Sequence, residues 1–170
     1  MFGYNGIQVD NGPQQAFKDL LEKESIVIAG GVFFYGESKE VFPSCCSGLE
    51  GGREILEGVI TMKSPWMGHT PYPTFEYVGD NVRVWSDDYI SIWEEDLPTE
   101  DMYYIEFERI DLIRKIKNLE TDLREFVYFP LYNRLQEIDK NLAGVIVENF
   151  FSWCDVIKNE RHLLSTFYNS

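Results

Sequence analysis

Two adjacent cysteines, Cys45 and Cys46, are the side chains best suited to chemistry, and they precede a predicted helix. Amide dipoles at a helix N-terminus lower the pKa of a thiol and so favour the nucleophilic thiolate. His69 could act as the base, with Asp87 or Asp88 to orient it. Cysteines also pack as small apolar residues, and acidic neighbours disfavour a thiolate. We therefore assign no catalytic residue, and the pattern favours a protein that is not an enzyme.

The histidines and cysteines do not have the spacing of a metal site. Zinc needs about four ligands of this kind, usually in closely spaced pairs. The candidates are Cys45, Cys46, His69, Cys154 and His162, which form no such pairs. Asp87-Asp88 lacks the alternating oxygen ligands of a calcium loop, and no glycine-rich loop is followed by Lys-Ser or Lys-Thr. We expect neither a metal nor a cofactor.

The charge is strongly negative and unevenly distributed. The chain has a net charge of −14, and the stretch from Glu76 to Asp111 holds 12 acidic residues against Arg83 and Arg109. Such a field repels nucleic-acid phosphates and anionic lipids, and it attracts a basic protein surface. The longest uncharged apolar-rich run, 25–36, is too short to span a bilayer. With no disulfide framework among the cysteines, we expect a cytoplasmic protein and no membrane partner.

Aromatic residues lie among these carboxylates, which is typical of a protein-binding face because aromatic anchors carry much of the binding energy at interfaces. The residues predicted for this face are Trp66, Trp85, Asp87, Asp88, Glu94 and Glu95. An alternative function is that of a small enzyme or ligand-binding protein. Its pocket would hold Cys45, Glu50, Trp66 and His69. A structural domain that forms homo-oligomers remains a third interpretation.

The first half of the chain reads mainly as strands and loops. A helix is predicted at 10–24, followed by a strand at 26–35 that Gly30-Gly31 interrupts, and a hairpin return at 41–42. Ser47 and Glu50 have the spacing of a capping box. The helix after them would bury Ile55, Leu56, Val59, Ile60 and Met62. The proline-containing segment 64–74 is expected to be an extended loop.

Alternating residues continue to about position 108, where the period becomes helical. Segment 74–85 has the pattern of a β-hairpin, and 89–93 and 102–108 are predicted as further strands, although a helix from Thr99 competes with the last of these. Leu112, Ile116, Leu119, Leu123 and Phe126 form the core-facing stripe of a helix that Pro130 should end. A second helix would begin near Leu131, a third would run through 142–153, and a last short helix would hold Leu163 and Leu164.

This order of elements predicts an α+β fold, with an antiparallel sheet from the N-terminal and central parts packed by C-terminal helices. We expect one domain over residues 1–170, sheet-rich at 26–108 and helical at 110–168.

Three segments resemble a group of uncharacterised bacterial proteins. The resemblance lies in Cys45-Cys46-Ser47-Gly48-Leu49-Glu50, in 64–71 (SPWMGHTP) and in 82–88 (VRVWSDD). It implies that these segments form one feature, and it brings no activity, cofactor or catalytic residue with it. In size and charge the chain also resembles the bacterial immunity proteins that neutralise toxins. This looser similarity implies an antitoxin-like inhibitor of a basic partner.

Overall fold

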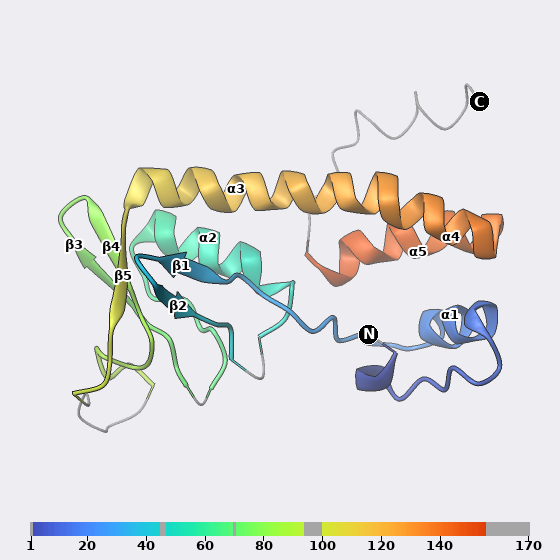
Figure 1. The fold of residues 1–170 in the computed structure, drawn as a ribbon, viewed down its shortest axis with the longest axis horizontal. Coiled ribbons are helices and arrows are strands. Elements are labelled where there is room, and N and C mark those ends of the chain that lie inside the picture. Colours follow the sequence, from blue (N-terminus) through green and yellow to red (C-terminus); the bar gives the residue numbers. More distant parts are fainter. Residues whose placement is uncertain (1, 45–46, 70, 94–99, 156–170) are drawn as a thin grey trace.

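Two small antiparallel sheets lie at one end of the molecule, and three of the helices lie at the other (Figure 1). The computed structural model describes residues 2–44, 47–69, 71–93 and 100–155. The strands are β1 (Phe34–Gly36), β2 (Lys39–Val41), β3 (Phe75–Val78), β4 (Asn81–Trp85) and β5 (Tyr104–Glu108). The α-helices are α1 (Pro13–Leu21), α2 (Gly51–Thr61), α3 (Arg109–Phe126), α4 (Tyr132–Ile138) and α5 (Lys140–Trp153). The described residues thus form the α+β fold that the sequence predicts.

The hairpin predicted at 74–85 and the strand predicted at 102–108 are confirmed as β3, β4 and β5, and the hairpin return predicted at 41–42 is β2, at 39–41. β1 pairs with β2, and the turn between them places Glu37 and Ser38 at positive φ. In the larger sheet β4 lies between β3 and β5, and all pairings are antiparallel. Val82 and Val84 face the core, so Arg83 and Trp85 point to the opposite side of the sheet.

The prediction of a strand at 89–93 is wrong, because Asp88 binds the backbone of this segment. Its carboxylate accepts hydrogen bonds from the N–H groups of Ile92 (3.0 Å) and Trp93 (2.6 Å). The carbonyl of Asp88 accepts a further bond from the N–H of Ser91. These bonds hold the segment in a turn and remove donors that a strand would need. The edge of β4 is occupied by β5 instead.

Two N-terminal predictions also need correction. Within 26–35 only the last two residues belong to a strand, because Gly30 and Gly31 take φ values of +147° and +146°. A Cβ at Gly31 would lie 2.8 Å from that of Pro43, so a glycine is required there. The predicted capping box does not form. The N–H of Leu49 donates to the carbonyl of Ile28 instead, and α2 begins only at Gly51, with no side-chain cap.

Pro130 does not end the helix that contains α3. The chain continues through a π-helical turn, Val127–Leu131, directly into α4. The wider turn accommodates a residue without an N–H, which would break a regular ladder. The predicted start of a helix near Leu131 and the helix over 142–153 agree with α4 and α5. The predicted helix at Leu163-Leu164 lies outside the described residues.

The buried side chains form two main clusters, and α3 contributes to both. The first lies between the sheets, α2 and the N-terminal half of α3. The second lies between the C-terminal end of α3, α4, α5 and Ile28.

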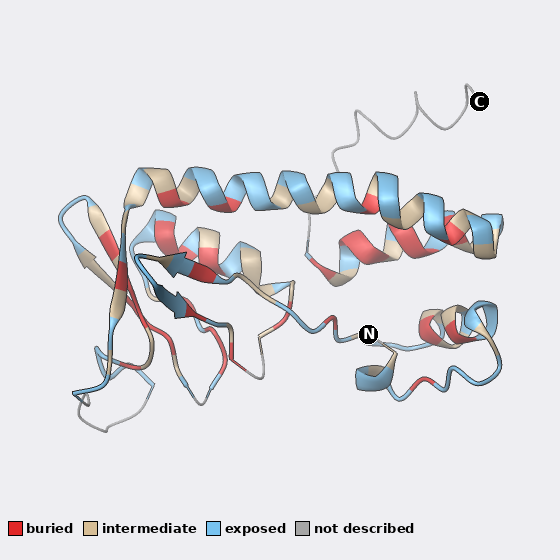
Figure 2. Ribbon diagram, viewed as in Figure 1, coloured by how far each residue is buried: buried red, intermediate tan, exposed pale blue. Residues whose placement is uncertain are grey.

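Most of α3 is exposed, with buried positions at intervals along it (Figure 2). Its predicted stripe is therefore only partly correct, since Leu119 and Phe126 are about half exposed. In α2, Ile60 and Met62 are likewise exposed rather than buried.

Asp139 is the N-cap of α5 and gives a testable pH dependence. Its carboxylate accepts hydrogen bonds from Gln14 Nε2 and from the N–H groups of Asn141 (2.8 Å) and Leu142 (3.1 Å). These bonds, that of Gln14 first, hold the pKa of Asp139 below its ordinary value of 3.8. The stability they provide is present above pH 3.8 and is lost as the pH falls through the lower pKa of the folded state.

We therefore expect Asp139→Ala to lower the Tm at pH 7, and the difference from wild type to shrink in acid. Thermal unfolding followed by circular dichroism at a series of pH values measures this difference. Asp10→Ala, at an exposed residue outside any cap, is the control. A Tm difference that stays constant from neutral to strongly acidic pH would contradict the role of the ionised carboxylate.

Candidate functional site

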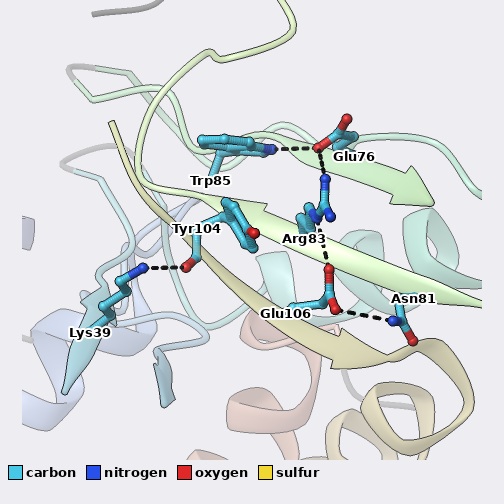
Figure 3. Close-up of polar contacts among 7 residues, drawn as sticks. All are labelled: Lys39, Glu76, Asn81, Arg83, Trp85, Tyr104 and Glu106. Carbon is cyan, nitrogen blue, oxygen red and sulfur yellow. Dashed lines mark hydrogen bonds and ion pairs between the residues drawn. The ribbon is translucent and has the colours of Figure 1, made fainter. Parts of the chain in front are cut away.

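The outer face of the larger sheet holds a row of charged and aromatic side chains that come from all three strands (Figure 3). Glu76 on β3 lies opposite Arg83 on β4, and Arg83 lies opposite Glu106 on β5. The same alternation places Trp85 beside Tyr104. The register of the sheet therefore aligns opposite charges directly across the strands, where they stabilise the pairing.

Arg83 links the two carboxylates. Its Nε atom lies 2.7 Å from Glu106 Oε2, and its Nη1 atom lies 3.5 Å from Glu76 Oε2. Asn81 Nδ2 donates a further hydrogen bond of 3.1 Å to Glu106 Oε1. The hydrogen bond to Glu106 is the main cause that raises the pKa of Arg83 above its ordinary value. The guanidinium therefore stays charged, and the network is rigid without being buried.

Aromatic rings continue the network. Trp85 Nε1 donates a 3.1 Å hydrogen bond to Glu76 Oε2, and the guanidinium carbon of Arg83 lies 4.7 Å from the centre of the Tyr104 ring. Tyr89 stacks on Trp85, with the ring centres 3.5 Å apart. Trp85 is only 7% exposed as a result, whereas the ring of Tyr89 lies at the surface. Carboxylates, a guanidinium and aromatic rings in contact with one another are groups of the kind that protein interfaces use for recognition.

Hydrogen bonds link residues next to the three segments that the sequence singles out. Ser44 Oγ donates hydrogen bonds to the carbonyls of Met67 (2.8 Å) and Pro71 (2.7 Å). Asp87 accepts a 2.7 Å bond from the N–H of Tyr72. Ser44 lies just before segment 45–50, and Tyr72 lies just after segment 64–71. These contacts are hydrogen bonds to backbone groups, which indicates that the segments support the fold.

Only some of the predicted partner-binding residues are available to a partner. Trp66 is exposed, Asp87 is half-buried, and Trp85 is covered by Tyr89. Asp88 is 4% exposed and its carboxylate binds two backbone N–H groups, so its predicted place on an exposed face is wrong. Glu94 and Glu95 lie outside the described residues.

The alternative pocket is only partly described, because Cys45 and Cys46 lie outside the described residues. Trp66 and His69 are exposed on the loop after α2, with their ring centres 6.1 Å apart. Glu50 lies at the start of α2, where its carboxylate folds over Gly48. An apolar cavity among the described residues is lined by none of Glu50, Trp66 and His69.

Sequence reasoning missed Glu76, Arg83, Tyr104 and Glu106 as site residues. The pattern that could have found them is the alternation along the strands, which assigns all four to the face opposite the valines of β4. Their register across the sheet was needed to show that they touch. Within the described part of the chain, no group of three or more His, Cys, Asp or Glu side chains could hold a metal ion. The described helices include none that is long and apolar enough to cross a membrane.

Comparison of the chain with protein families, curated proteins and solved structures gave no match.

Proposed function

We propose that the protein is a protein-binding module whose outer sheet face docks on a basic partner. The single observation that supports this most is the network of Glu76, Arg83 and Glu106, which crosses three strands on the outer face, with Glu106 exposed and the other two half-buried. It presents two carboxylates against one guanidinium, within a stretch that holds 12 acidic residues and two basic ones. Lysine or arginine side chains of a partner would pair with the outward-facing oxygens of these carboxylates.

Preorganisation supports the same proposal. Because the side chains already hold one another, little rotamer entropy remains to be lost on binding. The local negative charge would steer a basic protein toward the face and raise the association rate. Tyr89, which stacks on Trp85 of the network, is exposed and would serve as an apolar anchor.

In its most specific form, the module would act as an immunity-like or antitoxin-like inhibitor. Docking of the outer face would cover a cationic site on the partner, so inhibition would occur by occlusion. This form rests on the charge and size of the chain together with the exposed face.

A partner is first captured from a cell lysate with the purified protein. The test then compares the binding of this partner to two double variants, each of which removes two negative charges. Glu76→Gln with Glu106→Gln keeps one acceptor oxygen on each side chain for Arg83 but removes both negative charges. We expect at least tenfold weaker binding, which corresponds to about 1.4 kcal/mol. Glu57→Gln with Glu125→Gln, at exposed positions on α2 and α3, should leave the Kd nearly unchanged.

Isothermal titration calorimetry provides both Kd values. Raising the salt from about 0.1 M to about 1 M shortens the Debye length from about 10 Å to about 3 Å and should weaken wild-type binding. Equal losses in the two double variants, or an affinity that does not depend on salt, would refute the proposed face.

A further inference from the structure

A mostly apolar cavity of about 590 Å³ lies under the middle of α3. Leu56 on α2, with Leu119 and Leu123 on α3, forms one part of its lining. Val32 and Phe33 line it from the segment before β1. Cavities that hold small ligands have volumes of about 300–1,000 Å³ and similarly apolar linings. The cavity is therefore large enough for a ligand.

The cavity exists because the two cores do not meet below α3. Leu112 and Ile116 are buried in the first core, whereas Leu123 packs against the second. Leu119 belongs to the same helical stripe but is 48% exposed, because it lies between the two. An aliphatic side chain at a core-facing position without a packing partner indicates space for an apolar group.

Exposed aromatic rings continue the apolar surface out of the cavity. Phe33 and Tyr35 line it, and their ring centres lie 5.8 Å apart. Phe42 stacks on Phe33 at 4.7 Å, which extends the row by one ring. Tyr35 is 71% exposed and Phe42 is 61% exposed. Burying such rings is favourable, so a ligand chain that leaves the cavity could continue along them.

The charges around the cavity favour a positive group on the ligand. Three acidic residues line it, Glu120, Asp122 and Asp155, against the guanidinium of Arg53. Arg53 pairs with Asp155 at 3.3 Å and Arg124 pairs with Glu120 at 2.5 Å, so Asp122 supplies the negative charge next to the cavity that these two ion pairs do not neutralise. Cys154 also lines the cavity, and burial, together with the negative charge of Glu50, raises the pKa of its thiol to about 12. The apolar surroundings and the negative charge that raise this pKa therefore both act at a residue of the cavity lining.

We propose that this cavity binds an amphiphilic small molecule, with an apolar chain between α2 and α3 and a cationic head group next to Asp122. The site is separate from the outer sheet face and does not depend on the proposed partner. A fatty acid with an apolar chain of equal length should bind more weakly than the cationic amphiphile, because its carboxylate would face the carboxylates of the cavity lining.

The test uses the full chain and three defined probes, each below the concentration at which it forms micelles. Dodecyltrimethylammonium should bind with saturation in isothermal titration calorimetry. Dodecanoate has the same chain but a negative head, and should bind at least tenfold more weakly. Tetramethylammonium has the head without the chain and should not bind, which separates the cavity from general attraction to an acidic surface. Equal or tighter binding of dodecanoate would overturn the proposed head group.

A cavity-filling variant locates the site. Leu119→Trp should reduce the affinity for dodecyltrimethylammonium at least tenfold, because the larger ring occupies the space of the chain. Ile110→Trp makes a similar change on the same helix at a residue that is 65% exposed and does not line the cavity, so the affinity should remain as in wild type. Circular dichroism checks that both variants are folded. Similar affinities in the two variants would place the probe elsewhere and overturn the proposal.

Asp122→Asn tests the head group separately from the chain. It should weaken binding of dodecyltrimethylammonium several-fold and leave that of dodecanoate the same or tighter. Glu125→Gln, which removes the same charge three residues along α3, should change neither. If the two variants act alike, general charge explains the preference and Asp122 does not contact the head group.

Discussion

Phe75→Ala is expected to lower the free energy of unfolding by about 3–5 kcal/mol. The ring is 1% exposed and packs edge-to-face on Phe34, with the ring centres 5.6 Å apart. Phe34 belongs to β1 and Phe75 to β3, so this pair joins the two sheets. Its loss would leave a cavity between them that neighbouring side chains can only partly fill. Urea denaturation monitored by circular dichroism measures the change.

The control is the same substitution at an exposed phenylalanine. Phe42 is 61% exposed, and its main aromatic contact is the stack on Phe33. Phe42→Ala should therefore cost about 1 kcal/mol or less. If the two variants lose similar stability, then the sheets are not joined through the Phe34–Phe75 pair as the structure indicates.

Elements with local signals could be predicted from the sequence. The hairpin of β3 and β4 has alternating residues around a glycine-containing turn, and Gly79-Asp80 forms that turn in the structure. Pro13 stands at the first position of α1, where its missing N–H costs nothing. In each case the interactions that define the element lie within a few residues of one another.

The errors have two different causes. Segment 89–93 alternates like a strand, but the carboxylate of the neighbouring Asp88 accepts hydrogen bonds from its N–H groups, a local competition that the alternation does not show. Ser47 has the spacing of a helix cap, but the N–H of Leu49 pairs with the carbonyl of Ile28, 21 residues away along the chain. Local patterns carry no information on this second, distant partner, so propensity alone could not have predicted it.

The sequence predicted the region of the candidate site and, of its residues, Trp85. The charge pattern located the acidic stretch that contains the outer sheet face. Asp87 and Asp88 were predicted for this face from the local excess of negative charge beside aromatic residues. Their oxygens instead bind the backbone of the loops, whereas Glu76 and Glu106, which are 30 residues apart, meet at Arg83. The strand register that brings them together is a tertiary property.

Asp88→Ala should lower the free energy of unfolding, because this carboxylate stabilises the fold. The residue is 4% exposed, and its two oxygens accept hydrogen bonds from the N–H groups of Ile92 and Trp93. Its loss would leave both donors without an acceptor inside the loop. Hydrogen bonds to a charged group contribute about 1.5–3 kcal/mol each, and solvent can replace part of this near the surface. We expect a total loss of about 2–3 kcal/mol in the free energy of unfolding.

Asp88→Asn distinguishes the hydrogen bonds from the charge. The amide keeps one acceptor oxygen of nearly the same shape, and asparagine is as effective as aspartate in capping backbone N–H groups. We therefore expect Asp88→Asn to lose less than half as much stability as Asp88→Ala in the same urea denaturation experiment. Hydrogen exchange should also show faster exchange at Ile92 and Trp93 in the alanine variant, because both amides lose their acceptor. Equal losses in the two variants, with unchanged exchange at these amides, would mean that Asp88 stabilises the fold through its negative charge and not through the two hydrogen bonds.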